Sequence, residues 1–186
     1  MTKAVKGSLA ALLALAATPA LAETDVFHGW SKDGSWLVFQ RPGRNDITEL
    51  YFCQTSEVAP KWPALLNEQD KLTEAGLDCV RFLDVNKAPY QWQKQVAPGE
   101  AGTSVKGLVI AAELVTDGES PGWVIEGSGK TQTCYASGLR ESSKLQKAFW
   151  HPSLKFSAVI IDGTFHHCAV TVKPGKAPPP TPPKKK

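Results

Sequence analysis

From residue 23 onward, apolar and polar residues alternate in short runs, and turn-forming residues separate the runs. A period of two is the pattern of strands with one buried face. The runs predict strands at residues 36–41, 48–54, 79–84, 90–96, 108–116, 123–126, 131–136, 155–162 and 165–172. Asp-Gly pairs at 33–34, 117–118 and 162–163 are typical of tight hairpin turns, because glycine supplies the positive φ. We therefore expect a mainly β, or β-rich α+β, fold of antiparallel sheets.

One stretch has a helical pattern instead. Residues 63–75 start with Pro63, at a position that helices tolerate, and end before Gly76, a common helix stop. Leu65 and Leu72 fall on one helical face. We expect a short helix at 63–75 and a weaker helical turn at 142–148.

The N-terminus has the order of a secretory signal peptide. Lys3 and Lys6 precede an apolar run from Leu9 to Ala17, and small residues close the segment at Ala22. The apolar run is shorter than the roughly 20 residues that a spanning helix needs. We expect cleavage after residue 22, so that the mature chain begins at Glu23.

The remaining length suits one β-rich domain, residues 23–172. Residues 173–186 hold six prolines and five lysines, and this composition cannot bury a core. We expect a disordered tail, either simply solvated or touching anionic surfaces. Residues 23–172 hold 14 basic and 18 acidic side chains. This mildly acidic body lacks the basic stripe of a nucleic-acid-binding protein, and we exclude that function.

Four cysteines, Cys53, Cys79, Cys134 and Cys168, follow the signal segment. An even number of cysteines in an exported chain usually forms disulfides, here two, with three possible pairings. No pair has the Cys-x-x-Cys spacing of a zinc knuckle or a thioredoxin-like redox site. The cysteines therefore indicate an oxidising compartment, the periplasm or the outside of a bacterial cell.

Residues 29–39, Gly-Trp-Ser-Lys-Asp-Gly-Ser-Trp-Leu-Val-Phe, form a motif of an aromatic residue, an Asp-Gly turn and an apolar strand. The motif resembles the hairpin of TolB-type and WD-like propeller repeats, which also occurs in bacterial predicted secreted proteins of unknown function. The resemblance covers about a dozen positions and implies a local hairpin. Lys32 replaces the proline usual in these repeats.

Residues 149–160 repeat the same arrangement, with Trp150 related to Phe156 as Trp30 is to Trp36. Each segment leads into a second strand that carries a cysteine. We infer two degenerate halves, arranged as a sandwich or partial propeller. If each half closes its own disulfide, the pairs are Cys53–Cys79 and Cys134–Cys168.

Three patterns raise the question of site chemistry. Residues 127–131, Gly-Ser-Gly-Lys-Thr, end like a phosphate-binding loop but lack the first glycine and the following helix, so we exclude nucleotide binding. His166 and His167 precede Cys168, with His151 upstream, but neighbouring strand residues point to opposite faces and do not share a metal ion. We expect no metal and no cofactor.

The third pattern lies in the first hairpin, where His28 stands close to Ser31 and Asp33. These three residues are the nearest approach to a catalytic triad, and turn chemistry explains them better. Recognition is a further possibility, because Trp62, Tyr90 and Trp92 lie in polar sequence and are candidates for a binding surface. Ordinary half-buried packing is the interpretation that we favour for them.

These patterns favour an exported, disulfide-stabilised, non-catalytic interaction module of the cell envelope, with an envelope protein or polymer as its partner. The main alternative is an envelope hydrolase or carbohydrate-acting enzyme whose site is assembled from distant residues. A purely structural envelope protein is a third class.

Overall fold

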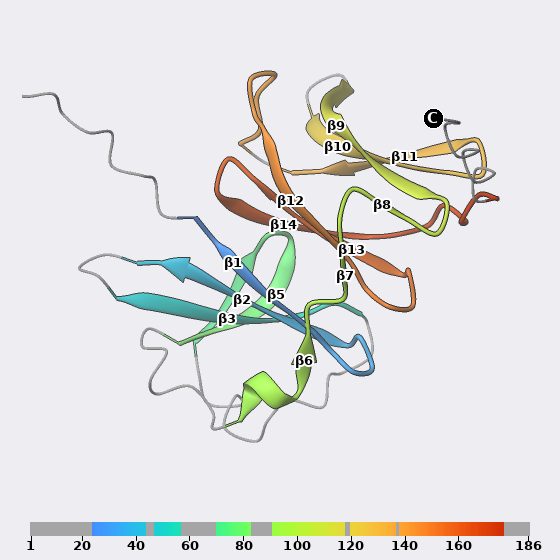
Figure 1. Ribbon diagram of the computed structural model, residues 1–186. Helices are drawn as coiled ribbons and strands as arrows, with labels where there is room; N and C mark the ends of the chain where they lie inside the picture. Colours follow the sequence, from blue (N-terminus) through green and yellow to red (C-terminus); the bar gives the residue numbers. More distant parts are fainter. Residues whose placement is uncertain are drawn as a thin grey trace, which may run out of the picture.

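The computed structural model describes residues 24–43, 47–56, 70–82, 91–117, 120–136 and 138–176. The described chain is mainly β and forms three antiparallel sheets, which confirms the predicted fold class (Figure 1). Sheet A has the order β4-β5-β3-β2-β1-β6, sheet B the order β14-β13-β12-β7, and sheet C the order β11-β10-β9-β8.

The strands have the following bounds. In sheet A they are β1 Val26–Ser31, β2 Trp36–Pro42, β3 Thr48–Gln54, β4 Asp70–Glu74, β5 Leu77–Phe82 and β6 Val96–Ala97. In sheet B they are β7 Glu100–Ala101, β12 Leu145–Trp150, β13 Phe156–Ile161 and β14 Thr164–Ala169. In sheet C they are β8 Ser104–Val105, β9 Leu108–Asp117, β10 Ser120–Gly127 and β11 Lys130–Tyr135.

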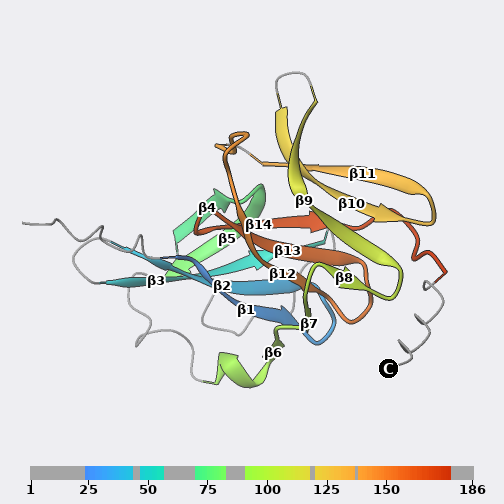
Figure 2. The same cartoon turned by 45° about the horizontal axis from the view of Figure 1, so that its top comes forward.

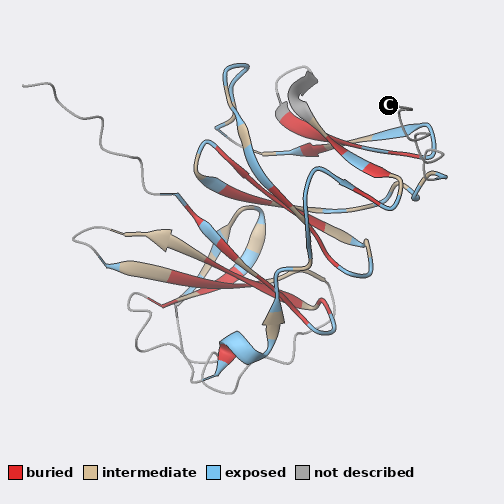
Figure 3. Ribbon diagram, in the orientation of Figure 1, coloured by how far each residue is buried: buried red, intermediate tan, exposed pale blue. Residues whose placement is uncertain are grey.

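Sheet B is the middle layer of a three-sheet stack (Figure 2). Ala158 and Ile160 of β13 pack into the cluster shared with sheet A, whereas Val159 and Ile161 pack into the cluster shared with sheet C. All four residues are at most 2% exposed, and the burial map shows most of β13 as buried (Figure 3). Burial on both faces explains why residues 158–161 of β13 are all apolar and do not alternate with polar ones.

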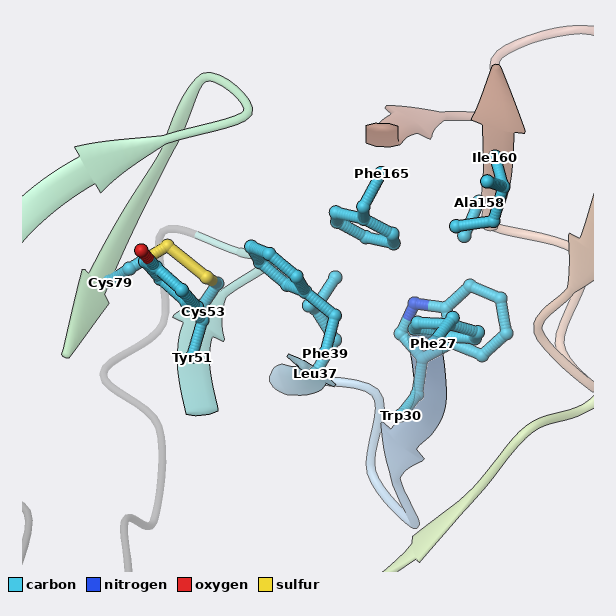
Figure 4. Close-up of a cluster of buried hydrophobic side chains, with 10 residues drawn as sticks. All are labelled: Phe27, Trp30, Leu37, Phe39, Tyr51, Cys53, Cys79, Ala158, Ile160 and Phe165. Carbon is cyan, nitrogen blue, oxygen red and sulfur yellow. A yellow bond between two sulfur atoms is a disulfide. The ribbon is translucent and has the colours of Figure 1, made fainter. Parts of the chain in front are cut away.

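Aromatic rings fill the space between sheets A and B (Figure 4). Phe165 of β14 stacks on Phe39 of β2, with ring centroids 4.4 Å apart, and on Phe27 of β1 at 5.4 Å. The Trp30 ring meets Phe27 edge-on at 4.5 Å. Offset and edge-on ring pairs add to the stability gained by burial, so this cluster fixes how the two sheets face each other.

The two predicted halves have the same strand register. Trp30 lies opposite Leu37 in the β1–β2 pair, and Leu37 lies opposite Cys53 of β3. In the second half, Trp150 lies opposite Ser157, which lies opposite Cys168. This correspondence supports the inferred relation between the halves, and the β1–β2 hairpin forms at the predicted Asp33-Gly34 turn.

The predicted helix at 63–75 is wrong from residue 70 onward. Asp70–Glu74 is strand β4, which pairs with β5, while 63–69 lies outside the described residues. Ala75 and Gly76 both have positive φ, the geometry of a two-residue hairpin turn, so Gly76 closes a hairpin and does not stop a helix. Leu72 packs against the core between sheets A and B, and this contact favours the strand.

Two further expectations need correction. The predicted strand at 90–96 contains a 3-10 helix at residues 92–94. Of the described residues in that segment, Val96 is the one that belongs to a strand, the short β6. The weak helical turn at 142–148 is instead the start of β12. The predicted hairpin at 29–39 covers the end of strand β1, but the list of predicted strands omits β1, because Gly29 and a bulge between Phe27 and Gly29 interrupt its alternation.

Candidate functional site

The predicted recognition surface is not formed by Trp92. Its side chain is 4% exposed and packs with Phe52 and Val96 over the outer face of sheet A. Trp62 and Tyr90 lie outside the described residues. The residues next to Trp92 in the sequence are polar and face solvent. This polar context is why the sequence made the Trp92 side chain a candidate for an exposed binding surface.

The cysteines form the disulfides Cys53–Cys79 and Cys134–Cys168, as the two-half hypothesis predicted. The first disulfide joins residues directly opposite each other in β3 and β5, within sheet A. The second joins β11 of sheet C to β14 of sheet B. It therefore braces one layer of the stack against the next.

His166 and His167 of β14 lie between the layers. His166 is 7% exposed and its ring lies 5.8 Å from Trp123 of sheet C, whereas His167 contacts Phe156 on the side of sheet A. Burial lowers the pKa of His166 to about 4 and that of His167 to about 3. The two rings point to opposite faces of β14, as expected. Within the residues described, no group of three or more His, Cys, Asp or Glu side chains could hold a metal ion.

The first hairpin uses its polar residues to shape the turn. Ser31 Oγ donates to Asp33 Oδ1 at 2.6 Å, and the Ser35 backbone N–H donates to the same oxygen at 3.1 Å. These hydrogen bonds, that from Ser31 first, lower the pKa of Asp33 to about 2. His28 points elsewhere, toward Gln40 and Trp92, so the three residues expected as the nearest triad do not form one.

Residues 127–131 form a tight turn between β10 and β11. Gly127 lies opposite Lys130, and the two residues between them, Ser128 and Gly129, both have positive φ. A strand follows the turn in place of the helix that a phosphate-binding loop requires. The glycines allow the tight turn of the hairpin, and Lys130 is the first residue after the turn.

The first residues of the segment predicted as a tail, 173–176, dock beside this turn. Ser128 Oγ donates to the Pro174 carbonyl at 2.7 Å, and the Gly175 N–H donates to the Gly107 carbonyl at 2.9 Å. A Cβ on Gly107 would lie 2.3 Å from the Gly175 oxygen, so the close approach requires glycine. Residues 173–176 therefore belong to the folded body, while 177–186 lie outside the described residues.

Gln132 of β11 fixes the path of the chain just before this contact. Its Nε2 donates to the Ala169 carbonyl at 2.6 Å, and its Oε1 accepts from the Thr171 N–H at 2.8 Å and the Thr171 hydroxyl at 2.9 Å. One amide side chain thus replaces a strand ladder between β11 and the chain that leaves β14. Figure 1 shows the red C-terminal segment lying beside sheet C.

Three chain segments therefore bring four exposed lysines to one end of the molecule, which we call the basic end: Lys106, Lys130, Lys173 and Lys176. Two hollows flank the β10–β11 turn there. The first, of about 430 Å³, is lined by Ser128, Lys130, Thr131, Gln132, Thr171, Val172 and Lys173. The second, of about 580 Å³, is lined by Ser104, Gly107, Val109, Glu126–Thr131, Gly175 and Lys176.

Sequence reasoning missed the basic end. Lys173 and Lys176 were assigned to the tail, and Lys106 and Lys130 are far from them in sequence. The available signal was the pair of glycine-lysine turns, Lys106-Gly107 and Gly129-Lys130, since lysines at turns between strands of one sheet gather at its ends.

The fold and this surface define a class: a three-sheet β protein with two disulfides and a lysine-rich end. Comparison of the chain with protein-family models, curated proteins and solved structures finds no match. In its described part, the chain has no helix with the length and apolar character that crossing a membrane would require.

Proposed function

We propose that the chain is an exported, disulfide-stabilised interaction module of the cell envelope that acts by binding and not by catalysis. The observation that carries this proposal is the basic end, where a braced framework holds two solvent-open hollows lined by lysine, hydroxyl and amide groups. Binding sites typically combine such preformed concavities with a few fixed polar groups.

Export is supported by the N-terminal charge and hydropathy pattern together with the two disulfides. Disulfides persist in oxidising compartments such as the periplasm or the extracellular space. These features are compatible with either destination.

The ionisable groups inside the stack support binding over catalysis. The Asp25 carboxylate is held by Arg41 and by the Phe165 backbone N–H, a set of contacts that joins strands. His166 and His167 lie between sheets, where substrate contact would need the layers to separate. A hydrolase would need such groups in a cleft open to its substrate.

The test is a cross-linking pull-down from envelope fractions with the chain that begins at Glu23, compared with the same chain after reduction and unfolding. We expect the oxidised, folded chain to capture a partner at a constant ratio of partner to chain, and we expect the reduced, unfolded chain to capture none. Substrate panels of glycans, esters and peptides provide the opposing measurement. Turnover that one carboxylate or histidine substitution abolishes, without loss of the fold, would replace the binding proposal with an enzyme.

A further inference from the structure

The basic end has the shape of a ridge between two hollows. The β10–β11 turn forms the ridge, and Lys130, at its exit, lines both hollows. The C-terminal segment places Lys173 in the first hollow and Lys176 in the second. Positive side chains therefore recur along a path that crosses the turn, and this arrangement suits an extended ligand better than a compact one.

The four lysines of the basic end have no close acidic partner among the described residues. The ion pairs among the described residues are made by Arg41 and Arg81 of sheet A, and none includes a lysine of the basic end. Glu126 is the one acidic residue among those lining the hollows. The body otherwise carries more acidic than basic side chains, so the basic end is a local reversal of charge. Such a reversal raises the local concentration of anions and orients their approach.

The uncharged groups that line the hollows indicate a ligand with more polar groups than a simple anion has. Hydroxyl and amide side chains line the first hollow, from Ser128, Thr131, Gln132 and Thr171, and Ser104 adds a hydroxyl in the second. Val172 and Val109 give each hollow an aliphatic patch. Hydroxyls and amides can both donate and accept hydrogen bonds, and aliphatic patches pack against the C–H faces of sugar rings.

The site is held in place before any ligand arrives. Gln132 fixes the chain that leads to Lys173, and the Ser128–Pro174 hydrogen bond fixes the segment beyond it. The disulfide to Cys134 anchors β11 to sheet B. A preorganised site loses less conformational entropy on binding.

We propose that the basic end binds a linear acidic polysaccharide that runs from one hollow to the other across the β10–β11 turn. The lysines pair with its carboxylate or other anionic groups, and the hydroxyl and amide groups bond to the sugar hydroxyls. This inference rests on the proposed function and names the partner class. A bilayer surface fits less well, because its headgroups form a plane that a ridge between two hollows would touch only at the turn.

The experiment measures binding of the chain from Glu23 to immobilised polygalacturonate, with neutral dextran as the reference polymer. The test variant is Lys130→Glu combined with Lys173→Glu. The matched control is Lys71→Glu combined with Lys94→Glu, which changes the net charge equally on the side of sheet A. At about a 5.5-fold change per lysine contact, two contacts give a factor of roughly 30, so we expect the test variant to bind roughly 30-fold more weakly and the control to bind within about twofold of the parent chain.

Three results would overturn the inference: equal loss in the test and control variants, equal binding to dextran and polygalacturonate, or preference for vesicles of equal parts phosphatidylglycerol and phosphatidylcholine. A third variant, with Lys184, Lys185 and Lys186 changed to serine, separates the tail from the basic end. Loss confined to this variant would also overturn it. If the envelope pull-down still yields a partner in those cases, the proposed function stands without the polysaccharide; if the pull-down is empty, both fail.

Discussion

The Asp25 carboxylate joins three strands, and its removal is the sharpest test of how the layers are held together. It accepts hydrogen bonds from Arg41 Nε at 3.0 Å and Arg41 Nη2 at 2.8 Å, and from the Phe165 backbone N–H at 2.8 Å. The Asp25 side chain is only 4% exposed. The contacts connect the start of β1 with β2 in sheet A and with β14 in sheet B.

The Asp25→Ala substitution leaves two groups without their partner. Breaking a buried ion pair by removing one member typically costs about 3–5 kcal/mol, and an orphaned backbone N–H contributes to that cost. Arg41 is 24% exposed and keeps Glu74 at 2.7 Å, so part of its charge remains compensated. We therefore expect a loss near the lower end, about 3 kcal/mol of unfolding free energy.

Glu74 provides a matched control on the same arginine. Its side chain is 27% exposed, so water replaces much of the interaction when the carboxylate is removed. Exposed and half-exposed ion pairs typically contribute about 1 kcal/mol or less. We expect Glu74→Ala to lower the unfolding free energy by no more than that amount.

The assay is urea unfolding of the oxidised chain, followed by tryptophan fluorescence, with both variants and the parent under one condition. A lower midpoint with an unchanged slope reports a change in stability alone. The reasoning is refuted if the two variants lose the same stability, or if Asp25→Ala loses less than about 1 kcal/mol.

Three further predictions concern the brace, the close packing and the pH response. Changing both Cys134 and Cys168 to serine should lower the unfolding free energy in urea by about 4 kcal/mol, because the disulfide closes a loop with a sequence separation of 34. A loss below about 1 kcal/mol would contradict the view that this disulfide stabilises the stack. Gly99→Ala should reduce folded yield sharply, because its Cβ would lie 2.1 Å from the Trp150 carbonyl oxygen, whereas Gly76→Ala at a similar φ meets nothing within 4 Å; equal effects would exclude the steric cause. Burial lowers the pKa of His166 to about 4, so acid protonates this histidine in the unfolded chain before it does so in the folded one. The unfolding free energy should therefore be highest above pH 6.5 and lower by roughly 2 kcal/mol at pH 5. A His166→Leu variant should lose less unfolding free energy between pH 7 and pH 5, and parallel curves of unfolding free energy against pH for variant and parent would refute this.

The sequence predicted elements whose determinants are local. Alternation located β3 without error at Thr48–Gln54, and the turn residues located the β13–β14 hairpin. It misassigned β4, because Leu65 and Leu72 satisfy a helical period while the strand depends on pairing with β5 and on contact with the core. Packing of Trp92 was the favoured interpretation, but the sequence did not show what covers it, since that surface comes from β3 and not from its own neighbours.

The basic end depends even more on distant contacts. Lys106, Lys130 and Lys173 belong to three separate turns or segments, and only the packing of the C-terminal segment against Ser128 and Gly107 brings them together. The role of Asp25 was equally hidden, because its partners lie 16 and 140 positions away. No local period or motif records such contacts.

The place of sheet B in the stack sets an order of events during synthesis. Apart from β7, its strands come from residues 145–169, after nearly all of sheets A and C have been made. Until these strands are made, sheet B cannot cover the inner faces of the two outer sheets, so the incomplete chain is prone to aggregation. Cys53–Cys79 can close within sheet A during this time, whereas Cys134 waits for Cys168. The second disulfide therefore marks a completed molecule.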